Sequence, residues 1–140
     1  MPVVDPYQSL VDALAALLGP SLKAIVLFGS QARGDGTPDS DHDILVVADG
    51  LPASPLDRQR HLRSCLRAIA HSLPGPVAFL ARTPDEVLAD LTPLLVDVCA
   101  DGRCLFGSGY FEPLRARALA AVGQAGLRRM RVAGALMWVF

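Results

Sequence analysis

The chain has 140 residues, of which 51% are hydrophobic and 19% are charged. This length predicts one domain, and the share of hydrophobic residues is sufficient for a core. The longest apolar runs are far shorter than the roughly 20 residues of a membrane span. The N-terminus shows no basic segment followed by an apolar one, so we expect no signal peptide. Cys65, Cys99 and Cys104 lack metal-ligand spacing and cannot all pair, which favours reduced thiols in a cytoplasmic protein.

The formal net charge is −1, but the charges are unevenly distributed. Residues 1–50 contain seven aspartates against Lys23 and Arg33, whereas residues 112–140 contain five arginines against Glu112. The acidic segment is therefore the candidate for chemistry. The basic segment is compatible with three contacts: nucleic acid, an acidic partner, or the acidic face of this same chain.

Helix and strand signals alternate through the first half of the chain. Residues 5–18 place leucines at helical spacing and are followed by Gly-Pro, which predicts a helix. Residues 22–29 and 41–49 are short apolar runs rich in branched side chains, which predict buried strands. The turn formers at 34–40 and 50–55 predict loops.

The alternation continues from residue 56. Residues 56–73 predict one amphipathic helix with its arginines on the outer face. Residues 74–82 predict a third strand. "TPDE" at 83–86 predicts a helix start, because threonine can cap, proline suits the first turn and glutamate can reach back. "TPLL" at 92–95 has the same opening pattern.

The C-terminal third predicts smaller elements. Residues 101–107 indicate a turn and a short edge strand, and residues 111–122 indicate a helix. The apolar residues 132–140 predict a strand or a docking segment. The complete order of helices and strands indicates an α/β protein with a small sheet.

The segment "LFGSQARGDGTPDSDHDILVV", residues 27–47, contains the most regular polar pattern. Side chains two apart on a strand share a face, so Asp41 and Asp43 project together, with Cα atoms roughly 6.5–7 Å apart, and His42 faces away. Two carboxylates on one face repel each other unless a cation lies between them. Mg²⁺ prefers such carboxylates together with substrate phosphates, and two ions can clamp a phosphoryl transfer.

The Gly-Ser pair at the end of the preceding strand supplies a complementary element. Gly29 allows close backbone approach, and Ser30 can begin a helix whose free N–H groups face an anion. Arg33 is suited either to a nearby aspartate or to a phosphate. A phosphate-binding turn beside an Asp-x-Asp strand predicts transfer of a nucleotide from a triphosphate.

These residues carry a family resemblance. Gly29-Ser30, ten intervening residues and Asp41-His42-Asp43 resemble the signature of the DNA-polymerase-β-like nucleotidyltransferase superfamily, and residues 27–47 resemble its minimal nucleotidyltransferases. The resemblance covers roughly residues 22–107. It implies a mixed β-sheet flanked by helices, with Asp41 and Asp43 as catalytic Mg²⁺ ligands. It also implies that Gly29 and Ser30, with Arg33 as a further candidate, bind the NTP.

The resemblance implies transfer of an NMP, most simply AMP from ATP, to an acceptor. In related toxin–antitoxin modules the acceptor is a tyrosine of a HEPN-type partner. We expect a nucleotidyltransferase domain over 1–110 and a C-terminal helix with an apolar tail over 111–140, packed on the domain or on a partner. A homo-oligomer is compatible with the sequence. A nucleic-acid polymerase is not expected, because no template-binding domain fits this length.

One position departs from the family pattern. Many members have a third carboxylate on the next strand, and counting five residues back from Thr83 gives Ala78. Asp85 and Glu86 lie in a predicted helix start, where capping explains them. The alternative function is therefore a catalytically impaired, metal- and nucleotide-binding regulatory module that acts by binding a protein.

The acidic segment also allows interpretations other than a magnesium site. An EF-hand requires glycine and glutamate where Ile44 and Gly50 stand, so calcium is not expected. Asp39 is predicted to stabilise a turn, and His42 to be structural. A solvated strand end remains the alternative for Asp41 and Asp43.

Overall fold

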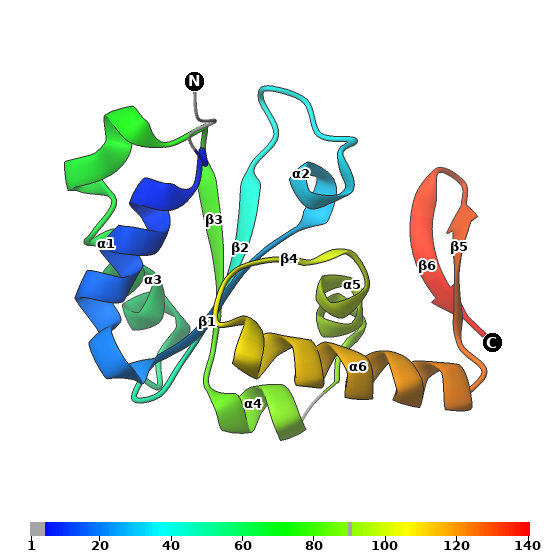
Figure 1. The fold of residues 1–140 in the computed structure, drawn as a ribbon. Helices are drawn as coiled ribbons and strands as arrows, with labels where there is room; N and C mark the ends of the chain where they lie inside the picture. Colours follow the sequence, from blue (N-terminus) through cyan, green and yellow to red (C-terminus); the bar gives the residue numbers. More distant parts are fainter. Residues whose placement is uncertain (1–4, 90) are drawn as a thin grey trace.

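A computed structural model describes residues 5–89 and 91–140. A four-stranded mixed sheet with the order β3-β2-β1-β4 forms the centre of the fold (Figure 1). Strand β1 is antiparallel to β2 and β4, whereas β2 and β3 are parallel. The strands are β1 Leu22–Phe28, β2 His42–Ala48, β3 Val77–Arg82 and β4 Arg103–Phe106. The predicted fold class and the predicted edge strand near residue 104 are confirmed.

Helices cover both faces of the sheet. Leu10, Leu14 and Leu62 pack with one strand face, and Val87, Val98 and Phe111 pack with the other. The first group comes from α1 Gln8–Leu18 and α3 Pro55–Arg63, and the second from α4 Pro84–Ala89, α5 Pro93–Asp101 and α6 Ser108–Gln124. No helix within the described part of the chain is long and apolar enough to cross a membrane.

The alternation of side chains along β2 determines where its polar residues lie. Ile44 and Val46 belong to the core under α1, whereas Leu45 and Val47 belong to the core under α5 and α6. Because faces alternate along a strand, Asp43 projects on the α5/α6 side. The first residues of β2 therefore present a carboxylate at the end of the sheet where β1 ends.

Both predicted threonine caps are present. The Glu86 carboxylate accepts a hydrogen bond from the Thr83 N–H at 2.8 Å, and Thr83 Oγ1 accepts one from the Glu86 N–H at 3.3 Å. Thr92 Oγ1 accepts from the Leu95 N–H at 3.2 Å. These bonds satisfy backbone donors that a helix start leaves free, and they confirm the starts of α4 and α5.

The prediction of one helix over 56–73 is wrong. Helix α3 ends at Arg63, and a 3₁₀ segment follows over Arg67–Ser72. Ser64 Oγ donates to the His61 carbonyl at 2.5 Å, and Cys65 Sγ contacts the Leu62 carbonyl at 3.1 Å. Such side chains compete with the backbone ladder and favour termination. The outward placement of all the arginines is also wrong, because Arg58 is 9% exposed.

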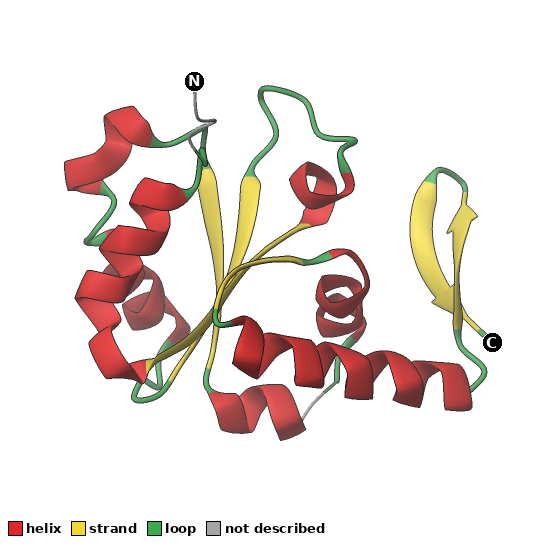
Figure 2. Cartoon of the chain, in the orientation of Figure 1, coloured by secondary structure: helices red, strands yellow, loops and turns green. Residues whose placement is uncertain are grey.

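The C-terminal residues form a two-stranded hairpin of β5 Arg128–Val132 and β6 Ala135–Val139 (Figure 2). Ala133 and Gly134 form its turn with φ values of 50° and 83°. Positive φ at both positions matches the twist of a two-residue hairpin. The predicted terminal strand is therefore confirmed, although its partner strand was not predicted.

Candidate functional site

The candidate site is built where β1 ends against β2. Gly29 opens the short helix α2 Gly29–Arg33, and the preceding Phe28 is paired with Asp43. Gly29 has φ +73°, and a Cβ at this position would overlap Asp43 Oδ2 and lie 3.2 Å from its Cγ. Both the left-handed backbone and the contact with the carboxylate exclude a side chain. The geometry thus brings two of the predicted site residues together.

The two aspartates have different surroundings. Asp41 is exposed and directly precedes β2, whereas Asp43 is half-buried. Burial, and then the Asp41 charge, raise the pKa of Asp43, while Arg33 and His42 act in the opposite direction. His42 lies on the other face, where its Nδ1 is 2.8 Å from Tyr7 Oη, so the structural role predicted for His42 is confirmed.

The loop between α2 and β2 is held by residues that the sequence analysis did not single out. Gln31 Nε2 donates to the carbonyls of Thr37 and Ser40 at 3.0 and 3.3 Å. Ser40 Oγ in turn accepts from the Thr37 N–H at 3.0 Å. These bonds fix the loop directly before Asp41. Turn-forming residues were a signal for the loop, but nothing in the sequence indicated that Gln31 spans it.

Arg33 has acidic neighbours, as one of the two predicted alternatives required. Its Nε lies 3.4 Å from Asp35, and its Nη1 lies 3.7 Å from Asp101 on α5. Asp101 also binds both terminal nitrogens of Arg129 at 2.6 and 2.5 Å. Hydrogen bonding to Arg129 is the main reason why the pKa of Asp101 is lowered. A charged network therefore connects α2 with the hairpin.

The same network anchors the hairpin to α5. Arg129 Nη1 lies 3.3 Å from Asp97, and Trp138 Nε1 donates to Asp97 at 2.8 Å. Of the three contacts that the sequence allowed for the basic segment, Arg129 makes one with acids of this chain, but these acids lie on α5 and not in residues 1–50.

The neighbour of Asp43 on β3 is Ala78. The predicted absence of a third carboxylate at this position is therefore also a feature of the site in three dimensions. Within residues 5–89 and 91–140, no group of three or more His, Cys, Asp or Glu side chains could hold a metal ion. Two carboxylates without further protein ligands fit Mg²⁺ only if water and substrate phosphates complete its coordination.

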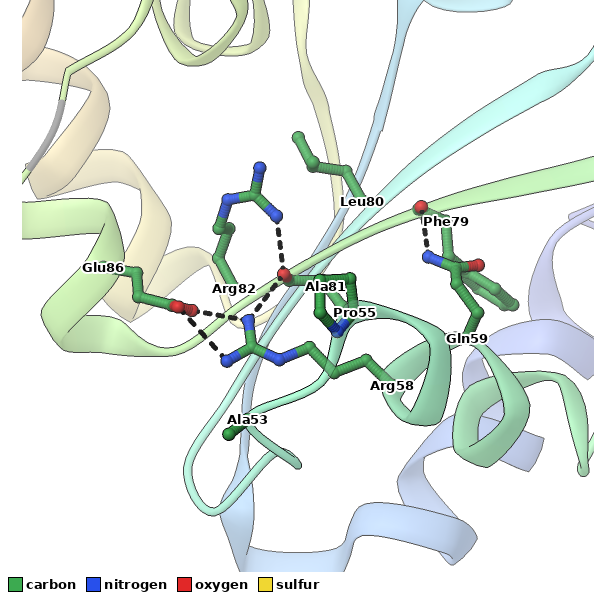
Figure 3. A pocket seen from close by; sticks show the side chains of 9 residues that line it. All are labelled: Ala53, Pro55, Arg58, Gln59, Phe79, Leu80, Ala81, Arg82 and Glu86. Carbon is green, nitrogen blue, oxygen red and sulfur yellow. Dashed lines mark hydrogen bonds and ion pairs between the residues drawn. The ribbon is translucent and has the colours of Figure 1, made fainter.

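A second polar group lies at the far end of β3, around a cavity of about 290 Å³ (Figure 3). Arg58 Nη1 and Nη2 bind the two oxygens of Glu86 at 2.6 and 3.1 Å, and Arg58 Nε donates to the Pro52 carbonyl at 2.6 Å. The hydrogen bond from Arg58 is the main reason why the pKa of Glu86 falls to about 2. This cavity is separate from Asp41 and Asp43.

Comparison with known families identifies the fold around residues 27–47. A model of the nucleotidyltransferase domain matches residues 8–90. The chain belongs to this nucleotidyltransferase family. The match includes Gly29, Ser30, Asp41 and Asp43, so the resemblance drawn from the sequence is confirmed.

Individual relatives agree with the family. A Methanocaldococcus jannaschii protein, MJ1305, named as a candidate protein adenylyltransferase, is 30% identical over 66% of this chain and 64% of its own length. The chain thus spans less than two thirds of that relative. A toxin–antitoxin structure with AMP-PNP superposes with TM-score 0.62 at 20% identity, covering 87% of this chain and 90% of the other. A mutant MntA–HpeT toxin–antitoxin structure gives 0.59 at 18% identity with the same coverage. At these identities the structural likeness shows the fold.

Proposed function

We propose that this chain is a Mg²⁺-dependent nucleotidyltransferase that transfers AMP from ATP to an acceptor. The observation that carries the proposal is the closeness of Gly29 to Asp43, whose carboxylate a Cβ at Gly29 would overlap. This closeness supports a phosphate-binding role for the Gly29-Ser30 turn beside a metal-binding Asp43. Family membership and the protein adenylyltransferase name of the relative support it. Protein hydroxyls are the acceptor class that this relative suggests.

The residues have distinct proposed roles. Asp41 and Asp43 hold Mg²⁺ and are the catalytic residues, while Gly29 and Ser30 hold the triphosphate through backbone N–H groups. The Arg33 side chain is 30% exposed; it leaves its partners Asp35 and Asp101 and binds a phosphate instead. Bound Mg²⁺ supplies neutralisation of the charge that develops on the phosphoryl oxygens.

The transfer requires the acceptor oxygen to form a bond to the α-phosphorus while the bond to the bridging oxygen breaks and pyrophosphate leaves. The proton of the acceptor hydroxyl must also leave. Because Ala78 offers no carboxylate, this proton passes to water or to a group of the acceptor protein. The chain's own contribution is therefore positioning and charge stabilisation.

Toxin–antitoxin structures among the neighbours support a partner protein. We infer an antitoxin role in the cytoplasm, in which a HEPN-type toxin is the acceptor and residues 1–110 form the catalytic unit. Residues 111–140 then form the helix and hairpin that pack on this unit and present an outer surface. Met130, Val132 and Met137 are exposed on that hairpin, as a docking surface requires.

The second candidate function is a regulatory module. Ala78 beside Asp43 favours it, because a module without an acceptor-activating base binds Mg²⁺ and nucleotide but transfers slowly. Such a protein acts by holding its partner. The two functions differ in whether the aspartates are needed for covalent labelling or only for nucleotide binding.

The deciding experiment measures transfer of label from α-³²P-ATP with Mg²⁺ to proteins of a source lysate. The purified chain is compared with the double variant Asp41→Asn/Asp43→Asn and with Asp39→Asn, a matched loop control. Labelling of a discrete acceptor by the wild type and the control, reduced by on the order of 10³-fold in the double variant, is expected. Mg²⁺-ATP binding without labelling supports the regulatory module. Absence of both overturns the proposal.

A further inference from the structure

One face of β3 is only partly covered by the helices. Along this strand Val77, Phe79 and Ala81 are buried, whereas Ala78, Leu80 and Arg82 are half-exposed. Because faces alternate, the three half-exposed residues share one side of the sheet. We call Ala78, Leu80 and Arg82 the β3 strip.

The β3 strip begins at the candidate site. In the parallel pairing, Ala78 lies beside Asp43, and Arg82 lies beside Val47. Val47 is 0% exposed under α5 and α6, whereas Leu80 packs on the same core but stays partly exposed, so the cover of the sheet thins at β3. The four-residue separation of Ala78 and Arg82 corresponds to about 13 Å along the strand. The β3 strip therefore forms a partly exposed strand face that runs from the neighbour of Asp43 to Arg82.

The geometry of the transfer indicates from which side the acceptor approaches Asp43. The sheet order places β1 and α2, with Gly29, on one side of Asp43 and β3 on the other. In phosphoryl transfer the attacking and leaving oxygens lie roughly in line. If the triphosphate lies against α2, pyrophosphate leaves on the β1 side. The acceptor must then approach across Ala78.

Arg82 is the charged group at the far end of the strip. Within the described residues, its side-chain hydrogen bond runs from Nη1 to the carbonyl of the adjacent Ala81, at 2.8 Å, and Arg58 Nη1 donates to the same carbonyl at 3.2 Å. Among the described residues no ion pair involves Arg82, whereas Arg58 holds Glu86. Figure 3 shows Arg82 and Leu80 on the same side of β3, with Arg82 and Arg58 both reaching the Ala81 carbonyl. Arg82 also lines two cavities of about 290 and 260 Å³.

The outer edge of β3 is closed to an added strand. Its carbonyls at Val77, Phe79 and Ala81 accept hydrogen bonds from side chains of α3 at 2.8, 2.9 and 3.2 Å. The donors are Arg63, Gln59 and Arg58. Occupied edge carbonyls prevent pairing with another chain. An acceptor must therefore lie across the partly exposed face of β3.

We propose that the β3 strip is the acceptor site and that it recognises a polypeptide with a hydroxyl side chain at Asp43 and an acidic side chain at Arg82. The distance of about 13 Å corresponds to four residues of extended chain. Leu80 contacts the apolar part between them. This inference rests on the proposed function, because the direction of approach depends on where the triphosphate lies.

The test uses two fluorescein-labelled peptides with one tyrosine each. One peptide has glutamate at the fourth position on either side of the tyrosine, and the other has glutamine there. Dissociation constants are measured by fluorescence anisotropy with Mg²⁺ and a non-hydrolysable ATP analogue. The wild type is compared with Arg82→Gln, Arg82→Lys and Arg67→Gln, which removes an exposed arginine away from the strip.

The wild type and Arg67→Gln should bind the acidic peptide roughly tenfold more tightly, as one charge-assisted contact implies. Arg82→Gln should remove this preference, and Arg82→Lys should retain part of it. Equal binding of both peptides, binding of neither, or a preference that survives in Arg82→Gln overturns the inference. Binding of the ATP analogue is measured separately, and its absence in the wild type overturns the proposed function instead.

Discussion

Two groups of carboxylates lie at opposite ends of the parallel strands, and their surroundings are opposite in character. At the start of β2, burial and Asp41 raise the pKa of Asp43. Beyond the end of β3, Glu86 is bound by Arg58 and by the Thr83 N–H, and its pKa falls to about 2. Among residues 5–89 and 91–140, Asp41 and Asp43 form no ion pair, whereas Glu86 is paired with Arg58.

The difference shows how a structural acid can be separated from a functional one. Glu86 completes a helix cap and neutralises the buried Arg58, so the fold itself accounts for both residues. The Asp41 charge raises the pKa of Asp43, and within the described residues neither side chain takes part in an ion pair. Unfavourable placement of charge is typical of functional sites. Substitutions at the two ends of the sheet should therefore have different effects.

The largest effect is expected for Gly29→Ala. The added methyl group must occupy a left-handed conformation and overlap the Asp43 carboxylate, so the turn or the aspartate must move. We expect a loss of label transfer of at least about 100-fold, since small displacements of a positioned group are costly, and a loss of unfolding free energy of about 1–3 kcal/mol. Transfer assays and urea unfolding measure the two effects.

The matched control for this substitution is Gly123→Ala in α6. Gly123 has no atoms within 4 Å of a built Cβ and no positive φ. Gly123→Ala should therefore raise the free energy of unfolding by about 0.5–1 kcal/mol and leave the label transfer unchanged. Full activity of Gly29→Ala would show that the contact with Asp43 is not part of the site.

An intermediate effect is expected for Glu86→Gln, which removes the carboxylate partner of Arg58. Glutamine keeps the capping acceptor but leaves the Arg58 charge without its counterion, so we expect a loss of about 2 kcal/mol in unfolding free energy. The Glu86 side chain is 42% exposed, and solvent screening keeps the loss below that of a fully buried pair. Urea unfolding at neutral pH measures it, with Asp85→Asn as the exposed control in the same helix turn.

The pH dependence of this loss has a definite sign. The pKa of Glu86 is lowered from 4.5 to about 2 on folding, so its contribution is complete above about pH 4.5 and disappears as the pH falls toward about 2. The stability difference between wild type and Glu86→Gln should shrink over this window. A difference that is constant with pH would mean that the ion pair does not stabilise the fold.

The smallest effect is expected for Asp101→Asn. Asp101 joins Arg33 to Arg129, so its neutralisation should loosen the hairpin. It should also strengthen nucleotide binding by about threefold, because Arg33 then has one fewer competing carboxylate to leave when it binds a phosphate. Trp138 is the single tryptophan of the chain, and its emission should shift to longer wavelength as the hairpin becomes more hydrated. Asp12→Asn, an exposed position on α1, is the control. Unchanged emission would show that Asp101 does not hold the hairpin.

Much of the fold was predictable because its signals are local. The strands over 22–29 and 41–49 follow from short apolar runs, and the starts of α4 and α5 follow from threonine-proline pairs. The break after Arg63 was not predictable from hydrophobic periodicity, because side-chain bonds of Ser64 and Cys65 end the helix. Strand β5 was missed because Ala133 occupies a turn position with positive φ that usually indicates glycine or asparagine.

The candidate site residues could be proposed from the sequence, because Gly29, Ser30, Asp41 and Asp43 lie in one short segment, which the family model includes in its match. Their surroundings depend on the tertiary structure. Strand pairing placed Ala78 beside Asp43, and the pairing of β2 with β3 set Arg82 on the same partly exposed face. Likewise, Arg33 and Arg129 meet at Asp101 because α5 packs between α2 and the hairpin. Such contacts join residues distant in sequence, and they depend on sheet register and helix packing that no local pattern encodes.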